Sequence, residues 1–182
     1  MLCEHYQHWM QPIHPLENTP VHCRLCANEM YESIFPRYDV KQMKCSFCYC
    51  VQEPSASCKN TDCTQYNKAH RYYCPICFLW ENNPHKNIFH CEGCKICRVG
   101  KRDDYVHCEK CQMCVPKGQK HYCVGGLAKD NPCPVCYEDV SQSTKPSLFL
   151  KCGHCIHLQC KIDWLNHGGM VALRHPCPMC KS

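Results

Sequence analysis

Pairs of cysteines three positions apart are the feature that most constrains the fold of this chain. The C-x-x-C spacing occurs ten times, at Cys23/Cys26, Cys45/Cys48, Cys74/Cys77, Cys91/Cys94, Cys94/Cys97, Cys108/Cys111, Cys111/Cys114, Cys133/Cys136, Cys152/Cys155 and Cys177/Cys180. Two sulfurs at this spacing on a tight turn suit two corners of a tetrahedron around Zn²⁺. Disulfide frameworks show no such preference for one spacing. The pattern therefore predicts a fold organised around metal-binding turns.

The chain has few of the side chains that build an ordinary core. Leu, Ile, Val and Phe together number 32 of the 182 residues, whereas Cys numbers 24 and His 13. A domain so poor in aliphatic side chains needs disulfides or metal ions to fold. The first ten residues lack the apolar stretch of a secretory signal, and no run approaches the roughly 18 residues of a membrane span. We therefore expect a protein of the cytoplasm or nucleus, where thiols stay reduced and bind zinc, with no membrane partner.

Changes in ligand pattern divide the chain into three zones. Residues 1–69 hold candidate ligands at irregular spacing and residues 70–124 hold repeats. Residues 128–182 hold a third arrangement, whose ligands follow the linker GGLAKDNP at 125–132. Sustained periodicity is scarce, so we expect short strands and zinc-held turns, with one short helix that begins near Cys160 and ends at Gly168. The predicted class is a small zinc-stabilised multidomain protein, mostly irregular, with short strands and few short helices.

The middle zone contains one eight-residue pattern twice, HCEGCKIC at 90–97 and HCEKCQMC at 107–114. Its candidate ligands form blocks of two, four, four and two: Cys74 and Cys77; His90, Cys91, Cys94 and Cys97; His107, Cys108, Cys111 and Cys114; His121 and Cys123. These twelve ligands complete the coordination of three four-coordinate ions if each ion takes two ligands from one block and two from the next. Adjacent extended residues point opposite ways, and we expect the first C-x-x-C of each copy to face upstream and the His and last Cys to face downstream. Three independent fingers would leave the end blocks without partners, and a disulfide cluster would not explain the matched His residues.

Eight further candidate ligands follow the linker: Cys133, Cys136, Cys152, His154, His157, Cys160, Cys177 and Cys180. Their spacing favours two interleaved tetrahedral sites, with Cys133, Cys136, His157 and Cys160 in one, and Cys152, His154, Cys177 and Cys180 in the other. The pattern resembles a RING finger of the H2 type, with two zinc ions in a cross-brace. Cys155 is left over, and we expect it to be a small thiol, buried or partly exposed, outside the sites.

The RING resemblance implies a docking surface for a ubiquitin-conjugating enzyme (E2). Val135, Trp164 and Pro178 occupy the positions at which the family contacts E2, and a Trp beside an apolar groove suits an interface. Lys181 occupies the position of a cationic linchpin that orients the E2-bound ubiquitin thioester. The ordinary alternatives are that Val135 and Pro178 shape their turns, that Trp164 caps a small core and that Lys181 is solvated.

The rest of the chain also resembles a known family. CEHY at 3–6, CRLC at 23–26 and YYCPIC at 72–77, together with the two repeats, resemble the CHY and CTCHY zinc fingers that precede a RING in one family of ubiquitin ligases. The resemblance implies two zinc sites in residues 1–69, made by Cys3, His5, Cys23 and Cys26, and by Cys45, Cys48, Cys58 and Cys63.

A third zinc site of the CHY finger is expected to be missing. Its ligand positions in the family align with Leu16, Glu17, Ala27 and Ser33, none of which is a Cys or a His. A substitute site built from His8, His14 or His22 is an open alternative. Cys50, His70 and His85 are spare, and we expect them on the surface or in packing.

The number of zinc ligands changes the net charge of the protein, and the net charge decides whether nucleic acid is an expected partner. The formal net charge is +5 with thiols neutral, but 22 thiolates and about seven Zn²⁺ ions would bring it to about −3. Lys and Arg are scattered without a basic run, so we do not expect nucleic acid as a partner. Homo-oligomerisation is left open by the sequence.

The family resemblance implies a RING-type E3 ubiquitin ligase. Its RING would bind a ubiquitin-charged E2 and promote transfer to a protein substrate held by the CHY/CTCHY region, with no covalent ubiquitin intermediate. The segment 29–40, EMYESIFPRYDV, is aromatic and offers either a recognition surface or local packing. The alternatives are a non-catalytic zinc-finger scaffold for protein or RNA, which would not need the E2 contacts, and a metal-storage or redox protein, which would need more unassigned thiols than Cys50 and Cys155.

Overall fold

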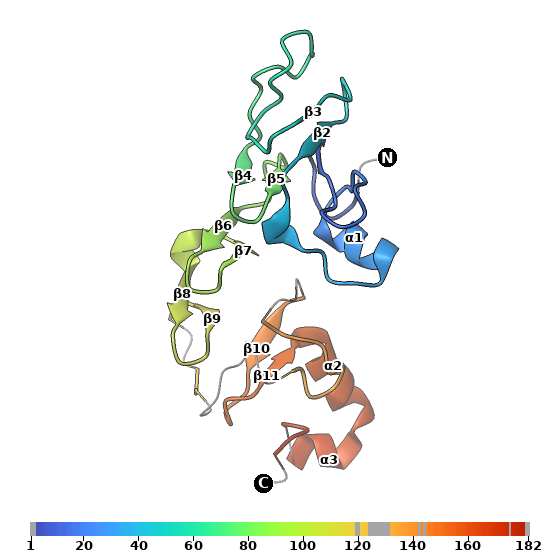
Figure 1. Cartoon of the computed structure of the whole chain (residues 1–182). Coiled ribbons are helices and arrows are strands. Elements are labelled where there is room, and N and C mark those ends of the chain that lie inside the picture. Colours follow the sequence, from blue (N-terminus) through green and yellow to red (C-terminus); the bar gives the residue numbers. More distant parts are fainter. Residues whose placement is uncertain are drawn as a thin grey trace. The chain divides into compact units, whose positions relative to one another are not determined.

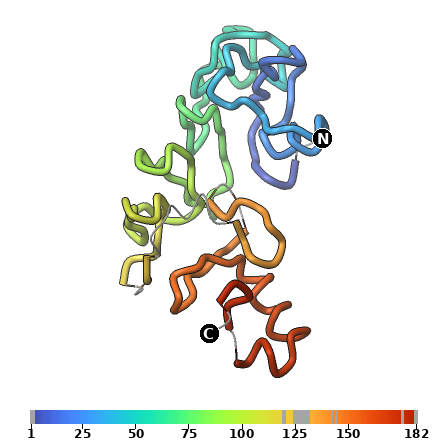
Figure 2. Tube along the Cα trace, turned by 60° about the horizontal axis from the view of Figure 1, so that its bottom comes forward, coloured from blue at the N-terminus to red at the C-terminus, as the bar shows by residue number. Residues whose placement is uncertain are grey.

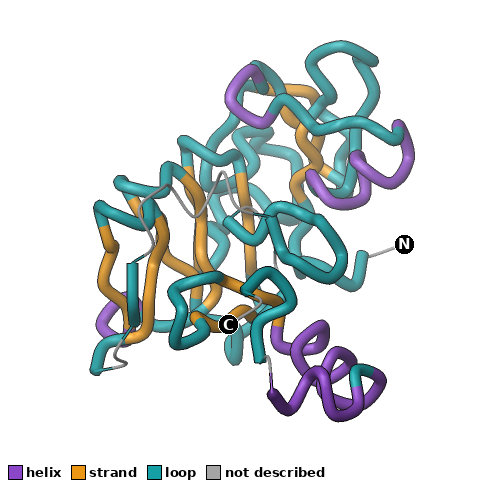
Figure 3. The backbone as a smooth tube through the Cα atoms, turned by 90° about the horizontal axis from the view of Figure 1, so that it is seen from below, coloured by secondary structure: helices purple, strands orange, loops and turns teal. Residues whose placement is uncertain are grey.

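Short strands joined by long loops make up this protein. The computed structural model describes residues 3–118, 121–123, 132–141, 143, 145–174 and 176–180. Its contacts divide it into two compact units, Met1–Ile88 and Phe89–Ser182, and each is described by itself (Figure 1). The strands are two to four residues long, and loops and turns occupy much of the chain (Figure 3). The predicted class is confirmed, and none of the described helices has the length and apolar surface that crossing a membrane requires.

The first unit contains a small antiparallel sheet of β1 (Met10–Pro12), β2 (Met43–Cys45) and β3 (Val51–Gln52), in that order. Met10 lies opposite Cys45 in the register. Met10, Met43 and Cys45 are fully buried, and they pack with Trp80 in one core cluster. Trp80 comes from the hairpin of β4 (Tyr72–Cys74) and β5 (Leu79–Glu81). Methionine, tryptophan and cysteine thus replace the missing aliphatic residues.

A helix that the sequence did not predict, α1 (Arg24–Tyr31), follows Cys23 directly. It ends at Tyr31 and is capped by Glu32, whose backbone is left-handed with φ of 49°. Ala27 is its one buried residue and packs in a second cluster with Val21, Phe35 and Val40. A helix that buries a single small side chain leaves no apolar period in the sequence, which explains why it was missed. The short 3₁₀ helix η1 (Arg37–Asp39) follows.

The repeated octapeptide folds as the same hairpin twice. The first copy gives β6 (Ile88–Cys91) and β7 (Ile96–Val99), and the second gives β8 (Tyr105–Cys108) and β9 (Met113–Pro116), with the 3₁₀ helix η2 (Arg102–Asp104) before β8. In each copy a C-x-x-C turn joins the strands. His107 lies directly opposite Cys114 in the β8–β9 register.

A shared backbone conformation shapes the C-x-x-C turns. The residue after the second Cys is left-handed in five of them, with φ between 46° and 60°: Tyr49, Phe78, Lys95, Gln112 and Tyr137. This conformation is uncommon for residues other than glycine. It turns the chain back after the second Cys, as in Tyr137, whose N–H donates to the carbonyl of Cys133 at 2.8 Å.

The C-terminal part of the second unit contains the hairpin of β10 (Ser147–Phe149) and β11 (Cys155–His157), followed by α2 (Leu158–His167) and α3 (Gly169–Arg174). The helix predicted near Cys160 is therefore confirmed and begins two residues earlier, whereas α3 was not predicted. Gly168 joins the helices because a Cβ there would lie 2.5 Å from that of Ala172. The linker before this part lies largely outside the described residues.

One apolar cluster unites the second unit. Ile156, Val140 and Leu150 form it together with Cys111 and Met113 from the β8–β9 hairpin, and all five are buried. Figure 2 traces both segments, with the hairpin in yellow and the C-terminal part in orange to red. The domain boundaries expected from the sequence, 1–69, 70–124 and 128–182, remain a prediction.

Candidate metal centres and RING surface

The candidate ligands gather in groups of four. Five of these groups have all their ligand atoms within 4.8 Å of one another: Cys3, His5, Cys23 and Cys26; Cys45, Cys48, Cys58 and Cys63; Cys74, Cys77, His90 and Cys97; Cys91, Cys94, His107 and Cys114; Cys108, Cys111, His121 and Cys123. All 24 cysteines are free thiols. Each group thus contains only thiol and imidazole donors.

The first group is assembled from the N-terminal segment and the start of α1. The Nδ1 atom of His5 lies 3.8 Å from Cys23 Sγ and 3.5 Å from Cys26 Sγ. The other ring nitrogen, Nε2, lies 3.8 Å from a carboxylate oxygen of Glu29. A carboxylate behind the ring orients a histidine ligand and favours its donor nitrogen, which is the arrangement common around zinc.

The second group, Cys45, Cys48, Cys58 and Cys63, lies beside the first unit's core. Cys45 and Cys58 are fully buried. The sulfurs of Cys45 and Cys63 lie 3.8 Å apart, and those of Cys48 and Cys58 lie 3.7 Å apart. Four sulfurs at about 2.3 Å from one Zn²⁺ ion would be separated by about 3.8 Å along each tetrahedral edge. The observed distances fit that geometry, whereas a disulfide would need about 2.05 Å.

The repeats share their ligands between groups, but in the opposite sense to the one expected. His90 and Cys97 group with upstream Cys74 and Cys77, while Cys91 and Cys94 group with downstream residues. The expected orientation is therefore wrong. Strand alternation separates neighbouring residues such as His90 and Cys91, yet it does not say which of them faces upstream. The hairpin decides this, because His and last Cys are cross-strand neighbours while the C-x-x-C lies in the turn.

A glycine in the first repeat makes room for a ligand of the second. A Cβ atom at Gly93 would lie 2.5 Å from the ring of His107. The Nδ1 atom of His107 lies 3.3 Å from Cys94 Sγ and 3.7 Å from Cys91 Sγ. The difference between CEGC in the first copy and CEKC in the second thus reflects the imidazole that packs on the first turn.

The RING ligands lie together as the interleaved spacing predicts. His157 Nδ1 lies 3.3 Å from Cys136 Sγ, and Cys133 and Cys160 interact with the same thiol. In the other site, His154 Nδ1 lies 3.5, 3.6 and 3.4 Å from the sulfurs of Cys152, Cys177 and Cys180. His154 directly precedes β11 and His157 is its last residue, so the two ends of one strand supply ligands to the two sites. This is the cross-brace of a RING-H2 finger.

The donors present fit zinc. Thiolate and imidazole ligands in groups of four, at tetrahedral spacing, match structural Zn²⁺ sites. Backbone N–H groups also donate to the sulfurs, as from Cys77 to Cys74 Sγ at 3.3 Å and from Cys94 to Cys91 Sγ at 3.4 Å. Such hydrogen bonds stabilise a thiolate over a thiol. The protein therefore has the ligand chemistry of a zinc protein, while the number of ions it binds stays a prediction.

Hydrogen bonds and ring contacts occupy the region in which the resemblance places a third CHY zinc site. His14 is buried, and its Nδ1 accepts hydrogen bonds from the backbone N–H groups of Leu16 and Glu17, both at 3.2 Å. Its ring lies edge-on to Tyr31 and Phe35, with centroids 4.8 and 5.1 Å away. His14 thus organises through hydrogen bonds the loop at which the resemblance places a pair of absent ligands.

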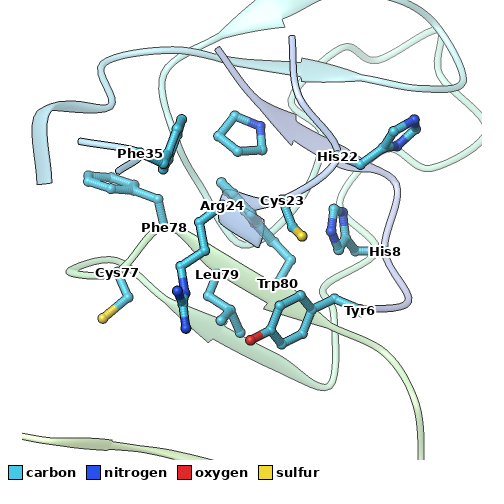
Figure 4. A pocket seen from close by; sticks show the side chains of 11 residues that line it. Tyr6, His8, His22, Cys23, Arg24, Phe35, Cys77, Phe78, Leu79 and Trp80 are labelled. Carbon is cyan, nitrogen blue, oxygen red and sulfur yellow. The ribbon is translucent and has the colours of Figure 1, made fainter. Parts of the chain in front are cut away.

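The other spare histidines have different surroundings. Figure 4 shows His8 and His22 among the side chains around a cavity of about 20 Å³ in the first unit, beside Trp80. Burial lowers the pKa of His8 to about 4, so the ring is neutral at physiological pH. His70 is buried and stacks on Trp9 with centroids 3.8 Å apart. His85 is exposed.

The two unassigned cysteines also differ. Cys155 is 3% exposed and belongs to the second unit's core cluster, and burial raises the pKa of its thiol to about 11. Cys50 is partly exposed, and its sulfur contacts the carbonyl of Val51 at 3.6 Å. The structure therefore gives Cys155 a packing role.

The expected E2 contacts can be located in part. Val135, Trp164 and Pro178 are each partly exposed, and Val135 packs against the core cluster of the second unit. Lys181 lies outside the described residues. Their contact with an E2 stays a prediction.

Sequence reasoning missed the residues behind the ligands. Besides Glu29, the carboxylate of Glu92 lies 4.0 Å from Nε2 of the ligand candidate His90. Arg98 donates to Cys94 Sγ at 3.8 Å. Glu92 is two residues after His90, a spacing that offers a signal in hindsight; Glu29 has none, because it is brought to His5 only by the fold.

Comparison with known proteins agrees with these sites. Residues 131–181 match the model of the Ring finger domain. The chain is 36% identical over 182 residues to the E3 ubiquitin-protein ligase SRFP1 of Oryza sativa subsp. japonica, covering 98% of the chain and 66% of the relative. It is 32% identical over 189 residues to the E3 ubiquitin-protein ligase RZFP34 of Arabidopsis thaliana, covering 98% and 62%. An uncharacterised RING finger protein of Schizosaccharomyces pombe is 36% identical over 162 residues, with 87% and 36% covered.

The cross-brace and the matched domain define this chain as a RING finger protein. Two of its relatives are named E3 ubiquitin-protein ligases, so the chain is similar to the RING-type E3 family. The chain spans less than two thirds of the length of most of these relatives and 66% of SRFP1.

Proposed function

We propose that this protein is a RING-type E3 ubiquitin ligase, which binds a ubiquitin-charged E2 and promotes transfer of ubiquitin to a protein substrate. The observation that carries the proposal is the RING cross-brace, in which both ligand groups are complete and Val135, Trp164 and Pro178 accompany them. Bound zinc would act structurally, by fixing the loops that carry these side chains.

The proposed role of the RING is to orient rather than to react. Val135, Trp164 and Pro178 bind the E2 through apolar contact, and Lys181 contacts both E2 and ubiquitin to hold the thioester ready for attack. Lys lacks the planar fork of donors of Arg, so it orients ubiquitin less firmly. The cysteines are metal ligands in this proposal, so ubiquitin passes directly from the E2 to the substrate lysine.

Substrate binding is proposed for the CHY/CTCHY region. In the segment 29–40, Met30, Ile34 and Tyr38 are 64, 86 and 55% exposed, and Leu16 of the neighbouring loop is 79% exposed. His14 links the loop to the segment through Tyr31 and Phe35. Exposed apolar residues gathered on adjacent segments favour a protein partner. We therefore assign the segment 29–40 a role in substrate recognition as well as in local packing.

A reconstituted ubiquitylation assay with a panel of E2 enzymes tests the proposal. Trp164→Ala should lower the rate of E2–ubiquitin discharge about tenfold or more, because truncating an aromatic interface anchor typically removes about 1.4 kcal/mol or more of binding energy. The protein should stay folded and keep its zinc. Leu173→Ala, on α3 and 70% exposed, is the control and should discharge normally. Normal activity of Trp164→Ala would contradict the proposed E2 surface.

The alternative is a zinc-finger scaffold without ligase activity. It predicts no discharge with any E2, although the zinc content would be the same. Localisation in the cytoplasm or nucleus is also proposed, because free thiols in such number suit a reducing compartment. Microscopy of a tagged protein tests that point independently of the enzymatic assay.

A further inference from the structure

We propose that the β8–β9 hairpin, with the ligand group of Cys108, Cys111, His121 and Cys123, positions the E2-binding side of the RING. Ubiquitin transfer would then depend on a metal centre outside the RING itself. This inference rests on the proposed ligase function and names Met113 as its positioning residue.

The first observation is a shared core. Met113 and Cys111 are each 2% exposed, and they belong to the same apolar cluster as Leu150 and Ile156 of the RING. A side chain so completely buried leaves a cavity when it is shortened, and the surrounding residues shift toward it. Shortening Met113 would therefore shift the RING residues that share its cluster.

The cluster also contains ligands of both RING metal sites and contacts a residue that is expected to bind E2. Cys133 and Cys177, from different RING sites, are buried members of the cluster, and Val135 packs partly buried against it. Val135 is the proposed E2 contact between the first two RING ligands. The hairpin thus packs into the core that supports one of the residues expected to meet E2.

A second contact ties the hairpin's metal group to the RING. The ring of His121 lies 5.1 Å from that of Phe149 in β10, with an interplanar angle of 47°. His121 Nε2 lies 3.4 Å from Cys123 Sγ, and Cys123 Sγ lies 3.6 Å from Cys108 Sγ. A metal ion in this group would fix the imidazole that packs on the RING sheet.

The hairpin provides its own control residue. Val115 lies two positions after Met113 on β9 and is also 2% exposed, but it is not a member of the shared cluster. Shortening either side chain removes buried apolar atoms from the same strand. Among the described contacts, Met113 is the one of the two that belongs to the cluster with RING residues.

The test compares Met113→Ala, Met113→Leu and Val115→Ala in the full chain, loaded with zinc. Native mass spectrometry first establishes that each variant keeps the wild-type zinc count. Single-turnover discharge of E2–ubiquitin should then slow about fivefold or more in Met113→Ala, as for a typical coupling between sites. Met113→Leu, which conserves volume, should restore it, and Val115→Ala should resemble wild type.

A structural readout keeps this inference separate from the ligase proposal. In Met113→Ala, amide hydrogen exchange at Val135 should speed up and the Trp164 indole NMR signal should shift, and neither change is expected in Val115→Ala. Equal behaviour of the two alanine variants would overturn the inference. If wild type discharges no E2, the ligase proposal fails, and the exchange and NMR data alone still decide whether the hairpin positions the RING.

Discussion

Glu81 is a carboxylate buried where the N-terminal segment meets the β4–β5 hairpin. It accepts hydrogen bonds from the backbone N–H groups of Gln7, Asn82 and Asn83 at 2.9–3.0 Å, and Lys86 lies 3.2 Å away. Lys86 also donates to the carbonyl of His5 and lies 4.2 Å from the centre of the Tyr6 ring. These contacts anchor the segment that carries the first ligand group.

The environment of Glu81 predicts a pH-dependent stability. Burial alone would raise its pKa, but the N–H donors of Asn83 and Gln7 and the charge of Lys86 outweigh burial and hold the pKa below its usual value of 4.5. A lowered folded-state pKa means that the ionised carboxylate stabilises the fold above the unfolded-state pKa, and that this contribution is lost as pH falls through the folded-state pKa.

Glu81→Gln should therefore lower the free energy of unfolding by about 1–3 kcal/mol at pH 7. The difference from wild type should be constant down to about pH 5.5 and shrink at lower pH. Urea unfolding at a series of pH values measures it, and acid release of zinc affects both proteins alike. Glu53→Gln, at an exposed position, is the control. A difference that grew on acidification would contradict the assignment.

The ligand residues themselves follow from the sequence, because their number and spacing leave few arrangements. The residues that orient them do not. Glu29 reaches His5 through α1, a helix without an apolar period, and Arg98 reaches Cys94 through hairpin geometry. Such contacts depend on where a long side chain lies after folding, which spacing along the chain does not encode.

At the scale of single elements, five of the C-x-x-C turns share a left-handed residue after the second Cys. Lys95 occupies this position in the first repeat, with φ of 57°, and is exposed. A residue with a Cβ atom loses about 1 kcal/mol in this conformation, whereas glycine adopts it without strain.

Lys95→Gly should therefore stabilise the protein by about 0.5 kcal/mol. The relief of strain is larger than this, but glycine loses more conformational entropy on folding, which offsets part of it. Lys95→Val should destabilise it by about 1 kcal/mol, because a β-branched side chain suits this conformation least. Thermal unfolding at fixed zinc concentration measures both. Lys101→Gly is the control, since Lys101 is extended with φ of −77° and should gain nothing from glycine. Equal effects at 95 and 101 would rule out relief of strain.

For the array of repeats, the sequence predicts that ligand blocks are shared but does not predict the direction of sharing. Counting blocks of two, four, four and two correctly indicated that the middle blocks are shared. The direction of sharing depends on the register His107↔Cys114, which aligns one His and one Cys across a hairpin. No residue pattern indicates that register independently. For α3 the reason differs, since its exposed Met170, Val171 and Leu173 follow no amphipathic pattern.

At the scale of the whole molecule, metal takes the place of a large core. The clusters contain few aliphatic side chains, and cysteines are prominent among their buried members. A structural zinc ion contributes on the order of 10 kcal/mol in small zinc-binding peptides, which exceeds the stability of a typical domain. Folding without metal is therefore not expected.

Chelation should unfold the protein in a defined order. Cys123 and Cys152 are exposed ligands, whereas Cys45 and Cys58 are fully buried. We expect about seven ions by native mass spectrometry, since the 28 candidate ligands fill seven four-coordinate sites. EDTA should remove zinc first from the groups of Cys123 and Cys152 and last from that of Cys45. Hydrogen exchange during chelation follows the order, and a protein that keeps its fold without metal would contradict this account.

The sharing of each octapeptide between two ligand groups also restricts how such an array can change in length. The copies begin at His90 and His107, seventeen positions apart. Excising residues 91–107 would bring His90 and Cys114 together with Cys74 and Cys77, and would leave Cys108, Cys111, His121 and Cys123 intact. Every remaining ligand would still belong to a group of four. A deletion that removed only part of an octapeptide would leave ligands without a complete group, so ligand-bearing units of this segment are expected to be gained or lost whole.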